Sequence, residues 1–190
     1  MSRFWSKVVH GLTPYTPGEQ PKLTNLIKLN TNECPYPPSD SVLEAIRAAT
    51  NGDLRLYPDP DSTALRQAIA DYYGIARDHV FAGNGSDEIL AFAFQALLNH
   101  DGPLVYPDIT YSFYPVYSQL NGIRAEHIAL EDDFTLDLDK VPDHAGAVIF
   151  PNPNAPTGQT VSLEAIARLC RRLPNRVIVV DDAYVDFGAE

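Results

Sequence analysis

The chain has 190 residues, and 14 lysines and arginines against 25 aspartates and glutamates give it a formal charge of −11 at pH 7. With 45% hydrophobic and 21% charged residues, the composition is that of a globular protein and excludes a disordered acidic tail. The length predicts one good-sized domain, or one domain with an arm. The acidic excess argues against binding to nucleic acids or anionic membranes, because both require a basic face.

Neither the cysteines nor the apolar stretches indicate secretion or a membrane span. Cys34 and Cys170 are the two cysteines. We expect both to be reduced and the protein to be cytoplasmic, because a domain of this size has little need of a disulfide. The longest apolar stretch, 89–94, is far shorter than the roughly 20 residues that a membrane-spanning helix requires, so we expect a soluble protein.

The beginning of the chain differs in character from the rest. Residues 1–38 contain six of the 16 prolines and predict an extended N-terminal arm, because proline fixes φ and lacks an amide donor. A helical pattern begins at Ser39 and ends at Asn51, and a second helix is expected over 62–73. We therefore expect an arm followed by a domain over 39–190.

From residue 80 onward, short apolar strands alternate with helices. Strands are predicted over 80–82, 104–106, 124–130, 147–150 and 177–180, and helices over 87–98, 111–120 and 162–173. This alternation indicates βαβ units and an α/β fold whose mainly parallel sheet is flanked by helices. The acidic segment 131–143 is expected to form a solvated edge.

In an open α/β sheet, ligands bind beyond the carboxyl ends of the strands. Residues 83–88, Gly-Asn-Gly-Ser-Asp-Glu, join a strand to a helix at such a position. The glycines permit a tight turn, and the amides and dipole of the helix start suit a phosphate. The segment has neither the Gly-Lys-Ser/Thr of nucleotide hydrolases nor the third glycine of the dinucleotide fingerprint. A simple helix cap at Ser86 or Asp87 is the alternative.

Two further segments follow predicted strands. The tyrosines of 107–114 offer a flat face to an aromatic ligand, or are buried for structural reasons. The prolines and glycine of 152–158 fix the backbone, and its asparagines offer donors to a ligand or to their own turn.

Asp181 and Asp182 end a fully apolar strand that should be central in the sheet. Desolvation of two carboxylates is costly unless a cation is bound beside them. The pair is suited to a divalent metal or to a protonated ring nitrogen, and a solvated loop is the third interpretation.

Taken together, these segments resemble the pyridoxal-phosphate-dependent aminotransferases of the aspartate aminotransferase fold, and most closely the histidinol-phosphate aminotransferase family. The resemblance runs through nearly the whole chain, in motifs at 12–15, 28–33, 56–59, 83–88, 110–111, 152–158 and 181–184. It implies an N-terminal arm and part of the large cofactor-binding domain of that fold. We expect the small C-terminal domain of the family to be absent from this sequence.

The resemblance implies pyridoxal 5′-phosphate as the cofactor. The backbone amides of Ser86 and Asp87 would bind its phosphate, with Gly85 allowing close approach. Tyr111 would stack on the pyridine ring. Asp181 would pair with the ring nitrogen and keep it protonated, so that the ring withdraws electrons from the substrate.

The phenolic oxygen of the cofactor would receive a hydrogen bond from Tyr184, and Asp181 and Tyr184 are the catalytic residues implied for this chain. The family usually has a second donor, an asparagine directly before Pro-Thr-Gly, where Ala155 stands here. We expect Asn154, one residue earlier, to take this role through a shifted turn.

The resemblance also implies a homodimer with a shared site. Tyr57 would reach the phosphate of the cofactor in the partner subunit. Tyr15, Asn32 and Glu33 would belong to an arm that closes over the substrate.

The resemblance implies an amino acid phosphate and 2-oxoglutarate as small-molecule substrates. The implied reaction is the transamination of histidinol phosphate with 2-oxoglutarate in histidine biosynthesis. The family forms a Schiff base through a lysine in a Ser-Lys segment well after the Asp-x-Ala-Tyr motif. The four lysines of this sequence, Lys7, Lys22, Lys28 and Lys140, have no such setting. We therefore expect an incomplete enzyme that is inactive alone.

Alternatives remain open. A phosphothreonine decarboxylase or an aromatic aminotransferase would have the same fold. A binding module that holds Mg²⁺ with Asp181 and Asp182, or an inactive folded relic, would belong to another class of protein.

Overall fold

The computed structural model describes residues 3–12, 21–22 and 25–187. No helix in these described ranges is long and apolar enough to cross a membrane. The predicted division into an arm and a domain after residue 38 stays a prediction.

The chain divides into two compact units, which are described separately. One unit comprises residues 15–82, and the other combines residues 1–14 with residues 83–190.

The unit of residues 15–82 is helical. It contains α1 (Asp40–Ala49), α2 (Thr63–Tyr73) and the 3-10 helices η2 (Gly52–Arg55) and η3 (Arg77–His79). Both predicted helices are confirmed. The first ends before Asn51, as α1, and the second, predicted over 62–73, corresponds to α2 to within about a residue. Arg66 ties α2 to the following segment, because its Nε donates to the carbonyl of Val80 at 2.7 Å and its Nη2 to the carbonyl of Arg77 at 3.1 Å.

The strand predicted over 80–82 is wrong for this structure. Val80 is buried and its backbone is extended, with φ −110° and ψ 125°. No strand among the described residues pairs with this segment. An extended segment becomes a strand only through hydrogen bonds to a neighbour, and apolar composition does not supply that neighbour.

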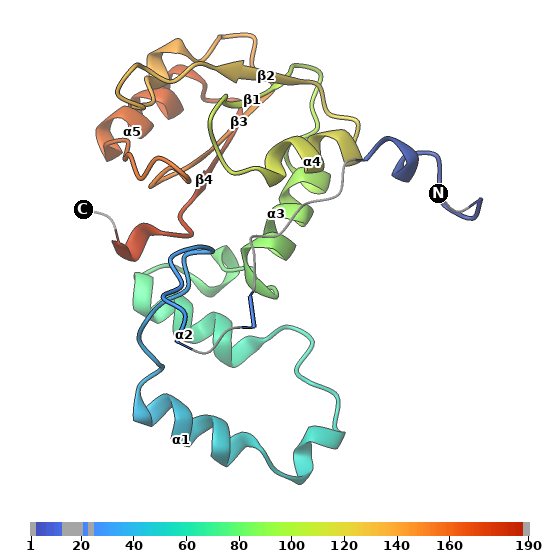
Figure 1. The fold of residues 1–190 in the computed structure, drawn as a ribbon, viewed down its shortest axis with the longest axis vertical. Coiled ribbons are helices and arrows are strands. Elements are labelled where there is room, and N and C mark those ends of the chain that lie inside the picture. The colour runs from blue at the N-terminus through green and yellow to red at the C-terminus, as the bar shows by residue number, and fades with distance from the viewer. Residues whose placement is uncertain (1–2, 13–20, 23–24, 188–190) are drawn as a thin grey trace. The chain divides into compact units, whose positions relative to one another are not determined.

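The other unit is built on a parallel four-stranded sheet in the order β2-β1-β3-β4 (Figure 1). Its strands are β1 (Leu104–Pro107), β2 (Ala125–Ile128), β3 (Ala147–Pro151) and β4 (Val177–Asp181), and its helices are α3 (Gly85–Ala96), α4 (Phe113–Leu120) and α5 (Leu163–Arg172). Short 3-10 helices occur as η1 (Val9–Gly11), η4 (Leu138–Lys140) and η5 (Val185–Phe187). The predicted α/β class with a parallel sheet flanked by helices is confirmed.

Two buried clusters cover the two faces of the sheet. On one face, α3 and α4 pack on β1 and β3 through Leu90, Phe94, Tyr114, Tyr117, Leu104, Tyr106 and Ile149. On the other face, α5 and the segment before β3 pack through Leu169, Leu173, Val105, Val148, Leu138 and Val141. Neighbouring residues of β1 belong to opposite clusters, because successive side chains of a strand point to opposite faces.

The acidic segment 131–143 is more than a solvated edge. Leu138 and Val141, at 4% and 1% exposure, are buried against the sheet. The aspartates of this segment stay at the surface, whereas Leu138 and Val141 contribute to the core.

The sheet reverses its winding between β1 and β3. The chain passes from β1 to β2 on one side and then to β3 on the other side of β1. The register of β1 with β3 covers Leu104–Ala147 and Val105–Val148, whereas its register with β2 continues to Pro107–Ile128. β1 and β3 therefore lose their pairing toward their carboxyl ends, which is where a crevice for a ligand forms in folds of this kind.

β4 does not have the central place predicted for it. It lies at the edge of the described sheet, and all five of its residues are half-buried. Its continuous apolar run follows from the cover that α5 and α3 provide on the two faces rather than from a neighbour on each side.

Two glycines allow the starts of β1 and β3 to approach closely. A methyl group on Gly102 would lie 2.6 Å from both the amide nitrogen of Gly146 and the carbonyl oxygen of His144. Because backbone atoms cannot swing away as side chains do, we expect Gly102→Ala to lower the free energy of unfolding by about 1–3 kcal/mol, measured by urea denaturation.

Gly52→Ala is the matched control, because an added methyl group there meets no atom within 4 Å. Its free energy of unfolding should stay within about 0.5 kcal/mol of the unsubstituted chain. Equal losses in the two variants would contradict the close approach at Gly102.

Candidate active site

A cavity lies at the carboxyl ends of the strands. It is lined by Ser86, Tyr111, Pro151, Ala155, Asp181, Ala183 and Tyr184. These residues come from the first turn of α3 and from the segments at the ends of β1, β3 and β4. The cavity measures about 70 Å³.

Four of the residues singled out from the sequence meet in this cavity. Ser86, Tyr111, Asp181 and Tyr184 are spread over almost 100 residues of chain, yet all of them line it. Parallel strands explain this meeting, because their carboxyl ends lie at one edge of the sheet.

Asp181 is held by two hydrogen bonds. The hydroxyl of Tyr114 donates to Oδ2 at 2.9 Å, and the amide of Ala183 donates to Oδ1 at 3.3 Å. Burial, followed by the negative charge of Asp181, raises the pKa of the Tyr114 hydroxyl far above its ordinary value. The hydroxyl consequently remains protonated and remains a donor.

The ring of Tyr111 is fixed from three sides. Its hydroxyl donates to Oδ1 of Asp87 at 2.8 Å. Its ring stacks on Phe113 with centroids 5.7 Å apart, and meets the edge of Tyr114 at the same centroid distance. These contacts set the orientation of an aromatic face at the cavity.

The first turn of α3 presents backbone amides without acceptors inside the helix. Asn84, which precedes the helix, makes no side-chain cap hydrogen bond. Gly85 has a φ of 79°, a left-handed conformation that favours glycine, and an added Cβ there would meet no atom within 4 Å. The turn therefore offers an accessible helix N-terminus, which suits an anion.

Asn154 is buried, and its side chain joins two loops. Its amide Nδ2 donates to the carbonyl of Ile109 and to Oγ1 of Thr157, each at 3.0 Å. Its Oδ1 accepts from Oγ1 of Thr110 at 3.1 Å. Both amide hydrogens are thus used within the protein, and Ala155 lines the cavity beside it. The predicted contact of Asn154 with a cofactor would require release of one of these bonds.

The remaining predicted residues belong to the unit of residues 15–82. Asn32 has a positive φ of 52°. Glu33 forms an ion pair with Lys28, at 2.5 Å from its Nζ, and this hydrogen bond and charge lower the pKa of Glu33. The side chain of Tyr57 is fully exposed, and Tyr15 lies outside the described residues.

Asp182 differs from its neighbour. It does not line the cavity, and its pKa is raised by partial burial and then by the charge of Asp181. Within the described ranges, no group of three or more histidine, cysteine, aspartate or glutamate side chains could hold a metal ion. The magnesium alternative thus has no supporting cluster in that part of the chain.

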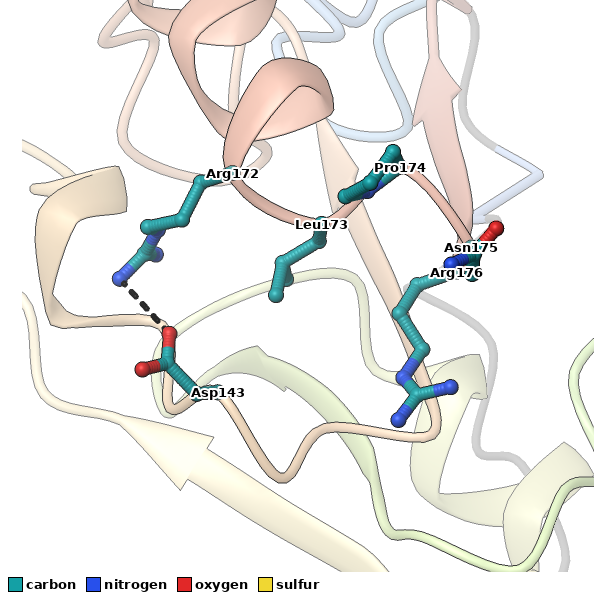
Figure 2. A pocket seen from close by; sticks show the side chains of 6 residues that line it. All are labelled: Asp143, Arg172, Leu173, Pro174, Asn175 and Arg176. Carbon is teal, nitrogen blue, oxygen red and sulfur yellow. Dashed lines mark ion pairs between the residues drawn. The ribbon is translucent and has the colours of Figure 1, made fainter.

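A second hollow, of about 390 Å³, lies where α5 ends and β4 begins, and Figure 2 shows the six side chains that line it. Arg172 forms an ion pair with Asp143 at 3.6 Å, drawn as the dashed line. Its guanidinium also donates to the carbonyls of Leu138 and Asp139 at 2.9 and 3.2 Å. Arg172 therefore ties the segment before β3 to α5.

Two features were not predicted from the sequence: the hydrogen bond from Tyr114 to Asp181, and the hydrogen bonds by which Asn154 joins two loops. Tyr114 follows Tyr111 by three residues, a spacing that places side chains near each other in a helical turn. That spacing was the available signal for Tyr114, whereas no local pattern distinguishes a buried asparagine from one that faces a ligand.

Comparison with known proteins connects this geometry to a family. A histidinol-phosphate aminotransferase of Gluconacetobacter diazotrophicus is 60% identical over 190 residues, covering 100% of this chain and 53% of that protein. The chain spans about half the length of the curated relatives that it matches.

Among solved structures, a histidinol-phosphate aminotransferase from Sinorhizobium meliloti in complex with pyridoxal-5′-phosphate has a TM-score of 0.71 and 29% identity, covering 80% of this chain and 42% of that one. An aspartate aminotransferase mutant from Thermus thermophilus reaches a TM-score of 0.76 at 21% identity, covering 94% of this chain and 50% of that one, and thus shows the shared fold. The sequence model of the family described as "Aminotransferase class I and II" matches residues 24–190. The chain therefore belongs to the class I and II aminotransferase family.

Proposed function

We propose that this chain supplies the cofactor-binding part of a pyridoxal-phosphate-dependent aminotransferase that acts on histidinol phosphate and 2-oxoglutarate. The observation that carries the proposal is the single cavity lined by Ser86, Tyr111, Asp181 and Tyr184. The choice of substrate is supported by relatives that are 54–60% identical over the whole chain and are histidinol-phosphate aminotransferases.

The residues at the cavity match the chemical groups of this cofactor. Pyridoxal phosphate carries a phosphate, a flat ring, a basic ring nitrogen and a phenolic oxygen. The α3 N-terminus at Ser86 suits the phosphate, and the oriented ring of Tyr111 suits the flat face. The carboxylate of Asp181 suits a protonated nitrogen, and the hydroxyl of Tyr184 suits the phenolic oxygen.

The cofactor, when bound, withdraws electrons from the α-carbon of the amino acid. The protein's part is to hold it in the state that does so. Asp181 would hold a proton at the ring nitrogen, and Tyr184 would donate to the phenolic oxygen. The amides of Ser86 and Asp87, freed for approach by Gly85, would bind the phosphate, while Tyr111 would keep the ring in place.

A homodimer with a shared site belongs to the proposal as well. The complete exposure of Tyr57 supports a contact with a partner subunit. Asn32 and Glu33 remain the proposed substrate-side residues together with Tyr15. The free and exposed Cys34 supports a reducing, cytoplasmic location.

Binding of the cofactor is testable on this chain. Pyridoxine 5′-phosphate is the suitable probe, because it lacks the aldehyde and cannot react with surface lysines. We expect Asp181→Asn to weaken its binding at least about tenfold, because the variant loses the charge that pairs with a protonated ring nitrogen. Isothermal titration calorimetry measures the change.

Asp186→Asn provides the matched control, since Asp186 is an exposed carboxylate five residues later that does not line the cavity. Its affinity for the probe should equal that of the unsubstituted chain. The assignment of Asp181 would be refuted by equal affinities in all three chains.

The reaction is testable in a chimera. We expect activity when the 190 residues replace the matched 53% of the Gluconacetobacter diazotrophicus relative. Glutamate should form from histidinol phosphate and 2-oxoglutarate, and Tyr184→Phe should lower kcat by at least about tenfold through loss of one donor. Faster conversion of phosphothreonine or of an aromatic amino acid than of histidinol phosphate would overturn the proposed substrate.

A further inference from the structure

A partly buried hydrogen bond links the helical core to the carboxylate at the cavity. Tyr114 lies in α4 and has 0% exposure, and its hydroxyl donates to Oδ2 of Asp181 at 2.9 Å. Asp181 is the last residue of β4, so this bond joins elements that are 67 residues apart. The side chain of Tyr114 therefore connects the core to the cavity.

The ring of Tyr114 has little freedom to move. Its centroid lies 5.9 Å from that of Phe94, 5.8 Å from that of Tyr106 and 5.7 Å from that of Tyr111. A hydroxyl on a ring packed this way is a donor at a defined point in space. A carboxylate bound to it cannot rotate freely about its own side-chain bonds.

The protonation state of Tyr114 also suits a donor. Burial and the neighbouring carboxylate raise the pKa of the Tyr114 hydroxyl well above its ordinary value, which favours the protonated form. Asp181 lines the cavity while its Oδ2 is held in this way.

We propose that Tyr114 is a positioning residue for Asp181, holding the carboxylate in place to receive a protonated ring nitrogen. This inference rests on the proposed function. If the proposal is right, loss of the Tyr114 hydroxyl should weaken the binding only of a ligand that has the ring nitrogen. A tyrosine that served only to fill the core would affect all ligands of the cavity alike.

Two probes separate these roles. Pyridoxine 5′-phosphate carries the ring nitrogen, and its carbocyclic analogue has C–H in that place with every other group unchanged. Calorimetric titration of the 190-residue chain with both probes should show that Tyr114→Phe weakens binding of the first about tenfold. This magnitude is the lower end of the roughly 10–100-fold loss that metal sites show when the hydrogen-bond partner of a ligating side chain is removed. Binding of the analogue should stay within about twofold.

Tyr106→Phe is the matched control. Tyr106 is a tyrosine of the same cluster, 2% exposed, and it does not line the cavity. Its loss of a hydroxyl should leave the affinity for both probes unchanged. The melting temperature of each ligand-free variant shows whether it is folded.

A double substitution makes the test independent of small changes in packing. In the Asp181→Asn background, Tyr114→Phe should change the affinity for pyridoxine 5′-phosphate by less than about twofold, because the group it positions is no longer charged. A full tenfold loss in that background would overturn the inference.

The outcomes separate this inference from the proposed function. If Asp181→Asn weakens binding but Tyr114→Phe weakens neither probe or both probes equally, the positioning role is wrong and the proposed function stands. If the unsubstituted chain binds neither probe, or binds both with equal affinity, the proposed role of Asp181 is overturned together with this inference.

Discussion

Parallel pairing of β1, β3 and β4 is the constraint on which the site depends. This pairing brings the segments that follow the three strands together at the carboxyl end of the sheet, although these segments are far apart in the sequence. β1 and β3 share a register only near their starts, which Gly102 and Gly146 allow by their close approach. Beyond that point the buried amide of Asn154 bridges the two loops. The cavity forms because β1 and β3 separate toward their carboxyl ends while Asn154 still joins the loops that follow them.

Tyrosines make the core and the site continuous. Tyr114 and Tyr117 are buried between α3, α4 and the sheet, yet their hydroxyls reach Asp181 and the backbone of Asp87. A tyrosine contributes a large apolar ring to the core and a polar group at its tip. Packing of the helices therefore also sets the orientation of groups at the cavity, and a substitution in this cluster affects stability and binding together.

Much of the fold could be predicted because local patterns determine it. The alternation of apolar strands and helices identified the parallel sheet, and the motifs at 83–88 and 181–184 identified residues that meet in one cavity. Periodicity, however, does not name a strand's partner, which is why 80–82 was wrongly predicted as a strand and β4 was placed at the centre. Likewise, composition does not show that the side-chain amide of Asn154 donates both of its hydrogens to groups of the protein, the carbonyl of Ile109 and Oγ1 of Thr157.

The sequence by itself determined the class of fold, the family and the chemical types available for a site, because these follow from periodicity and from short motifs in a fixed order. The tertiary structure decided which of those groups meet and which are already bound. Tyr114 donating to Asp181 and Asn154 joining the loops after β1 and β3 are contacts between residues 44 to 67 positions apart. Such contacts depend on the register of strands and the packing of helices, and these are properties of the folded chain as a whole.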